Sequence, residues 1–111
     1  METVAEWRTL IASIIREYAA YPPSHGEIQV EAIIDERQDH YEMIHAGWSG
    51  KYRIHGSVIH IDIRDGKIII QHDGTEEGIG DRLVEAGVPK DKIVLGYKHP
   101  YLRLDTGFAV A

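Results

Sequence analysis

The chain has 111 residues, the length of one domain, and its 43% hydrophobic and 27% charged residues are typical of an ordinary globular protein. It contains no cysteine, which excludes disulfides, thiolate metal sites and thiol nucleophiles. The net charge of −6 has the wrong sign for a domain that holds DNA by phosphate neutralisation alone.

The N-terminal segment predicts a helix rather than a targeting signal. Acidic residues stand where a signal peptide needs basic ones, and no apolar run reaches the roughly 18 residues of a membrane span, so we expect a non-membrane, cytoplasmic protein. Apolar residues recur over residues 1–20 at steps of three and four. Thr3 is the predicted N-cap, with Glu6 completing a capping box, and Pro22-Pro23 ends the helix.

Strand patterns follow the prolines. Residues 28–34 and 40–48 alternate largely between apolar and polar side chains, with a polar turn at residues 36–39. Residues 52–64 and 67–72 flank Asp65-Gly66, a strong hairpin signal. A two-residue loop places Ile61 opposite Ile70, Ile59 opposite His72 and His60 opposite Gln71. A three-residue bulged loop would shift this register.

A second helix is predicted over residues 76–86. Thr75 can cap it, and Glu76 complements the positive end of its dipole. Gly87 suits the left-handed position after a helix, and Pro89 prevents continuation. Residues 93–95 form a short buried strand. The sequence thus predicts an α+β fold, with a long N-terminal helix on a mainly antiparallel sheet and a second helix and short strand toward the C-terminus.

Several motifs resemble the XisI-like family, the excision controlling factors of the cyanobacterial fdxN element. They are Asp39-His40-Tyr41, Gly47-Trp48, and residues 66–76, 83–90, 93–96 and 108–111. Length and the leading helix also match, so one XisI-like domain is expected over residues 1–111. The resemblance implies a role in DNA recombination beside a site-specific recombinase and a second, nuclease-like factor, XisH. It carries over no catalytic residues.

The residues that join the fourth strand to the second helix form a candidate polar or anion site. They are Gln71, His72, Asp73, Thr75 and Glu76. A helix N-terminus has free backbone N–H groups that can hold an anion. The alternative is structural, since Asp73 and Thr75 can shape the turn and cap the helix.

Two residues are weak metal candidates. His60 and Asp62 lie on one strand face, and histidine and carboxylate are common ligands of divalent ions. None of the HxH, HExxH or HxxE spacings occurs, and the two-residue loop puts His60 and His72 on opposite faces. Histidines hydrogen-bonded within the sheet are the alternative. A nuclease site would use Asp62 with Arg64 or Lys67, but a second acid in the usual short pattern is missing.

Aromatic and basic residues form a candidate surface for a partner or for DNA. They are Trp48, Tyr52, Arg53, Tyr97, Lys98, Tyr101 and Arg103. Interfaces favour tyrosine, tryptophan and arginine, although Trp48 and Tyr52 could instead be core residues of the sheet. Residues 90–111 carry Lys90, Lys92, Lys98 and Arg103 against Asp91 and Asp105, a local balance of +2.

Three functional hypotheses follow. The leading one is an accessory factor that is not an enzyme, needs no cofactor, forms homo-oligomers and binds an XisH-like partner. The second is a small metal-dependent nuclease or phosphoesterase. The third is direct DNA binding through the C-terminal basic segment. Under the leading hypothesis, any contact with DNA is indirect.

Overall fold

Helix α1 (Val4–Ala19) begins at the predicted capping box. In the computed structural model, which describes residues 2–111, Thr3 Oγ1 accepts the backbone N–H of Glu6 at 3.2 Å. The Glu6 carboxylate in turn accepts the backbone N–H of Thr3 at 3.2 Å. Trp7, Ile11 and Ile15 form part of the buried side of the helix. The first predicted helix and its cap are therefore confirmed.

Within the described residues, the sheet contains five strands in chain order. They are β1 (Glu27–Asp35), β2 (His40–Ser49), β3 (Tyr52–Arg64), β4 (Lys67–Asp73) and β5 (Ile93–Leu95). The first four form an antiparallel meander, whereas β5 runs parallel to β4. A parallel pair needs a crossover, which helix α2 (Ile79–Glu85) supplies. The predicted α+β class is confirmed.

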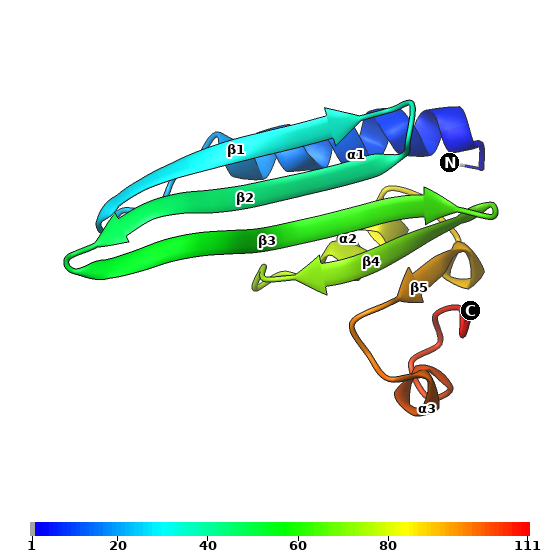
Figure 1. Ribbon diagram of the computed structural model, residues 1–111. Helices are drawn as coiled ribbons and strands as arrows, with labels where there is room; N and C mark the ends of the chain where they lie inside the picture. Colours follow the sequence, from blue (N-terminus) through cyan, green and yellow to red (C-terminus); the bar gives the residue numbers. More distant parts are fainter. Residues whose placement is uncertain (1) are drawn as a thin grey trace.

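The two faces of the sheet have different environments. Helices α1 and α2 lie behind the sheet, and within residues 2–111 no helix lies over the face turned to the viewer (Figure 1). The helix-covered face carries an isoleucine-rich core that includes Ile59, Ile61, Ile68 and Ile70, all with no exposed surface. We call the other side of the sheet the open face.

The β3–β4 hairpin has the predicted loop but not all of the predicted register. Asp65 and Gly66 both have positive φ, at 51° and 72°, as a two-residue type I′ turn requires. Ile61 pairs with Ile70, as predicted. Beyond that pair the predictions of His60 opposite Gln71 and Ile59 opposite His72 are wrong, because Gln71 is the extra residue of a β-bulge. His60 therefore pairs with His72, so these two histidines do not lie on opposite faces.

Helix α2 starts three residues later than predicted. Gly78, with φ of 89°, precedes its first residue, Ile79, whose backbone N–H donates to Asp73 Oδ2 at 2.7 Å. The prediction of a Thr75 cap is wrong, because Thr75 Oγ1 accepts the N–H of Gly78 before the helix begins. The predicted end of α2 is confirmed. Gly87 has a φ of 103°, and the Val88 N–H donates to the Leu83 carbonyl oxygen at 3.0 Å.

The C-terminal segment lies along the β5 edge of the sheet. A 3₁₀ turn (Lys90–Lys92) leads into β5, and a single helical turn, α3 (Pro100–Arg103), follows it. Ala109 then forms a parallel bridge with Val94, which brings the chain end beside β5. Among residues 2–111, none of the helices has the length and apolarity needed to cross a membrane.

Candidate functional site

A buried carboxylate lies on the open face. Strand β3 alternates Ile59, Ile61 and Ile63 toward the helices with His60 and Asp62 on the other side. Asp62 is only 2% exposed, although no helix covers it in the described part of the chain. Burying a charge is costly unless neighbouring groups compensate it, so the contacts of Asp62 define the site.

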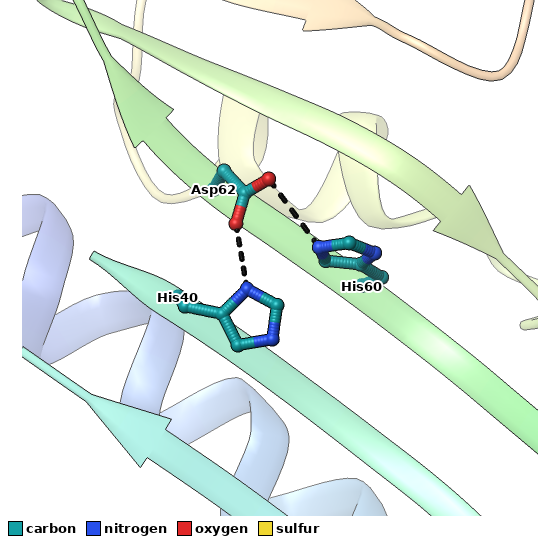
Figure 2. A group of neighbouring side chains, drawn as sticks. All are labelled: His40, His60 and Asp62. Carbon is teal, nitrogen blue, oxygen red and sulfur yellow. Dashed lines mark hydrogen bonds and ion pairs between the residues drawn. The ribbon is translucent and has the colours of Figure 1, made fainter. Parts of the chain in front are cut away.

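Side chains from three strands surround Asp62. His40 Nδ1 of β2 lies 2.9 Å from Asp62 Oδ1. The side-chain amide of Gln71 on β4 and the guanidinium of Arg64 on β3 each donate to Asp62 Oδ2 at 3.2 Å. Figure 2 shows His40 and His60 converging on the carboxylate in front of the strands, with the helices behind. We call His40, Glu42, His60 and Asp62 the Asp62 cluster.

A second carboxylate joins this cluster through His40. Glu42 Oε2 lies 3.0 Å from His40 Nε2, so the imidazole bridges two acids. Burial acts to lower the pKa of His40, but its hydrogen bonds to Asp62 and Glu42 outweigh burial and raise it. Burial likewise acts to raise the pKa of Asp62, yet the bonds from His40 and Gln71 hold it below its usual value. The cluster thus favours the deprotonated, charged forms of Asp62 and Glu42 on either side of the His40 ring.

His60 is the member whose bonding is incomplete. Its Nε2 is 3.3 Å from Asp62 Oδ2, but the geometry does not make a hydrogen bond. This nitrogen is buried and, among residues 2–111, has no hydrogen-bond partner. The ring contacts that of His40 edge-on, with centroids 4.7 Å apart.

Two β-bulges flank this part of β3. In the β2–β3 ladder Met43 pairs with Ile59 and Ile44 with Ser57, which leaves Val58 as an extra residue. In the β3–β4 ladder the extra residue is Gln71, which contacts Asp62. Bulges re-aim side chains and are frequent beside functional sites. Here they lie on both sides of His60.

The sequence identified half of the Asp62 cluster. His60 and Asp62 were candidates, and the structure places them together, while His40 and Glu42 were missed. The available signal was His40-Tyr41-Glu42, a spacing of two that puts both polar groups on one strand face. The proposed nuclease partner of Asp62 was Arg64 or Lys67, and Arg64 is the cation that contacts it.

The candidate anion site has a structural arrangement. Asp73 Oδ1 accepts the backbone N–H of Thr75 at 2.9 Å and its hydroxyl at 2.6 Å, while Oδ2 accepts Ile79 N–H. A carboxylate therefore already lies at the start of α2. His72 and Glu76 are exposed to solvent. Gln71 points instead to the Asp62 cluster.

The predicted aromatic and basic surface is divided into two patches. Trp48, Tyr52 and Arg53 lie at the tip of the β2–β3 hairpin, and α3 lies at the opposite end of the sheet (Figure 1). Trp48 is 49% exposed and Tyr52 78%, so neither is a core residue. We call Trp48, Tyr52 and Arg53 the hairpin-tip surface.

The hairpin-tip surface borders a hollow. The Arg53 guanidinium lies 5.3 Å from the centre of the Trp48 ring, within cation–π range. Both residues line a recess of about 460 Å³ together with Glu27, Gln29 and Ala46. The hairpin-tip surface therefore combines an exposed aromatic ring, a positive charge and an adjacent recess.

We call the other four residues of the predicted surface the C-terminal patch: Tyr97, Lys98, Tyr101 and Arg103. Its arginine already has hydrogen-bond partners within the chain. Arg103 donates to the backbone carbonyls of Lys98, Gly96 and Val110, at 2.9, 3.4 and 3.2 Å. Lys98 lies 5.9 Å from the centre of the Tyr97 ring. Tyr101 is exposed and stacks on His99. Arg103 therefore holds the C-terminal loop together.

Comparisons with known proteins agree with this architecture. The XisI protein family model matches residues 1–110. A solved XisI-like protein from Anabaena variabilis ATCC 29413 superposes with a TM-score of 0.90 at 37% identity, covering 98% of this chain and 100% of that chain. The fdxN element excision controlling factor XisI from the same organism superposes at 0.84 with 35% identity, covering 96% and 97%. No curated protein matches the chain.

Proposed function

This chain belongs to the XisI family, and from that premise we propose that it is a non-catalytic accessory factor that controls excision of a DNA element. A similar solved protein carries the name fdxN element excision controlling factor, which supports this role. We propose that the factor acts by binding a protein partner of the XisH-like, nuclease-like kind, and that the hairpin-tip surface makes the contact.

The observation that carries the proposal is the exposure of this surface. Trp48 and Tyr52 expose large aromatic areas, and Arg53 stacks on the indole ring. Tryptophan, tyrosine and arginine are enriched among the residues that contribute most to binding at protein interfaces. The hollow beside Trp48 would receive a side chain of the partner.

The charge of the chain favours a protein partner over DNA. The net charge is −6, and Arg103 of the basic C-terminal segment is committed to backbone carbonyls. DNA affinity depends on basic groups free to neutralise phosphates. Contact with DNA through the partner agrees better with these features than direct contact.

The experiment is co-purification with an XisH-like protein, followed by calorimetry of the purified pair. We expect a complex at micromolar concentration. Trp48→Ala and Arg53→Ala should each weaken it by roughly 10-fold or more, the effect of losing about 1.4 kcal/mol at an interface.

Tyr101→Ala is the matched control, because Tyr101 is 80% exposed on the distant C-terminal patch. It should leave affinity unchanged. Absence of any complex would refute the partner. A loss confined to Tyr101→Ala would move the interface to the C-terminal patch.

The homo-oligomer expected from the sequence stays a prediction. Symmetric homo-oligomers are the commonest soluble assemblies. Light scattering of the purified chain, with and without Trp48→Ala, measures the number of subunits and shows whether copies of the chain compete with the partner for the same surface.

A further inference from the structure

We infer that His40, His60 and Asp62 form a binding site for one divalent transition-metal ion on the open face of the sheet. The inference concerns the Asp62 cluster rather than the hairpin-tip surface, so it is independent of the partner proposed above.

The geometry is the first support. His40, His60 and Asp62 each offer one ligand atom, and these three atoms all lie within 4.8 Å of one another. Nδ1 of His40 and Nε2 of His60 lie 2.9 and 3.3 Å from the carboxylate oxygens of Asp62. Ligands that each lie about 2.0–2.2 Å from a zinc ion are at most about 4.4 Å apart. A modest rotation of the rings would therefore bring three ligands onto one ion, with the backbone of β2 and β3 unchanged.

The unused nitrogen of His60 is the second support. It is buried, points toward Asp62 and has no hydrogen-bond partner among residues 2–111. A buried polar atom without a partner costs free energy. A metal ion bound to Nε2 would provide the missing interaction.

The contact of Glu42 with His40 is the third support. Glu42 Oε2 lies 3.0 Å from His40 Nε2, the nitrogen that faces away from the proposed ion. Histidines that bind metals usually donate their second N–H to a carboxylate or carbonyl group, which fixes the tautomer and the direction of the ring. Glu42 therefore has the position of such an orienting group, and in the metal-bound state the contact of His40 Nδ1 with Asp62 would be replaced by a bond to the ion.

The donor set determines the class of ion. Two imidazoles and one carboxylate suit Zn²⁺, Fe²⁺ and neighbouring transition ions, whereas Mg²⁺ and Ca²⁺ prefer oxygen ligands alone. His40 and His60 are partly exposed, at 36% and 28% of their side chains, so an ion can enter. Three protein ligands leave the fourth position of a tetrahedral ion for water or another ligand.

Calorimetry of the untagged full chain with Zn²⁺ alone at neutral pH tests the inference. We expect one ion per chain. His40→Ala and His60→Ala should each lower the affinity by more than about 100-fold, and Glu42→Gln by about 10–100-fold, the usual effect of losing an orienting group. Circular dichroism of each variant establishes that it is folded.

His55→Ala is the matched control, because His55 is an exposed histidine on the same strand β3. It should bind Zn²⁺ as the native chain does. NMR of the histidine rings gives a second measurement, with Zn²⁺ shifting the signals of His40 and His60 but not that of His55. Absence of binding by the folded native chain, or one-to-one binding that survives both His40→Ala and His60→Ala, would overturn the inference.

Discussion

The two faces of the sheet differ although the same strands supply both. Along β3, alternate residues send Ile59, Ile61 and Ile63 into the core and His60 and Asp62 to the open face. The helix-covered face is apolar and buried, whereas the open face holds histidines and carboxylates joined by hydrogen bonds. The strand period of two thus lets one segment pack apolar side chains into the core on one side and present polar side chains on the other.

The difference shows how a charged group is buried without a covering layer. Around Asp62 the shielding comes from neighbouring side chains, including His40, His60 and Gln71. Their rearrangement would expose the carboxylate without disturbing the core. Side chains of a binding site on this face can therefore rearrange at a smaller cost in free energy than side chains inside the core.

The largest expected effect compares one residue type on the two faces. Ile61→Ala removes a side chain with no exposed surface from the centre of the core and should lower the free energy of unfolding by about 2–5 kcal/mol. Ile33→Ala, on β1 and 37% exposed, should cost about 0.5 kcal/mol or less. Urea unfolding of both variants measures the difference. Equal losses would show that the open face is covered in solution.

Gly47 tests the end of the sheet near the hairpin-tip surface. A Cβ at this position would lie 2.0 Å from the carbonyl oxygen of Glu27 and 2.8 Å from Ile28 Cα, both backbone atoms of β1. Gly47→Ala should therefore push β1 from β2 and cost about 1–3 kcal/mol, the usual range for overpacking.

Gly56→Ala is the control for this clash, because a Cβ on Gly56 meets no atom within 4 Å. Its effect on the free energy of unfolding should be near zero or slightly favourable. Thermal unfolding of the two variants provides the comparison. A Gly47→Ala protein as stable as the Gly56→Ala protein would mean that β1 shifts at no cost.

The third prediction concerns the open face alone. Asp62→Asn keeps the shape of the side chain but removes the charge that Arg64 and His40 contact. We expect a loss of about 1–3 kcal/mol in metal-free buffer, as when a hydrogen bond to a charged group is removed. Chemical denaturation measures it, with Asp65→Asn in the exposed turn as the control. A loss well above about 3 kcal/mol would contradict the division of roles between the faces.

The sequence predicted those parts of the molecule whose causes are local. Thr3 with Glu6 marks the start of α1, and Asp65-Gly66 fixes the two-residue hairpin turn, because each feature depends on a few adjacent residues. The bulge at Gln71 has no such signal, since it depends on how β3 and β4 fit the layers around them. The predicted register therefore failed beyond that point.

The Asp62 cluster was half predicted for the same reason. His60 and Asp62 are two residues apart on one strand, so their common face follows from the strand period. The pairing of His40 with Asp62 depends on the register between β2 and β3, which includes a second bulge after Met43. A tertiary contact that lies beyond a bulge cannot be predicted from periodicity alone.

The smallest expected effect concerns a link between the two sides of the sheet. Arg8 of α1 donates to both carboxylate oxygens of Asp39 at 2.7 and 3.1 Å, and Asp39 immediately precedes His40. The hydrogen bonds from Arg8 lower the pKa of Asp39, although burial acts in the opposite direction, and the Tyr41 hydroxyl adds to the lowering. The ion pair thus ties the covering helix to the turn that leads into the open-face cluster.

Stability from this pair depends on pH in a defined direction. Because the pKa of Asp39 is lower in the folded state, the contribution is complete above the unfolded value of about 3.9 and is lost as the pH falls through the folded value. Arg8→Ala should cost about 0.5–1 kcal/mol at pH 7, a small value because the Arg8 side chain is 38% exposed. Urea unfolding at pH 7 and pH 3 should show the gap between native and variant closing in acid. Arg37→Ala, in the same turn and exposed, should show no such convergence. If the gap is the same at pH 3 as at pH 7, Arg8 stabilises the fold through packing of its aliphatic stem, and the two sides of the sheet are joined by apolar contact rather than by charge.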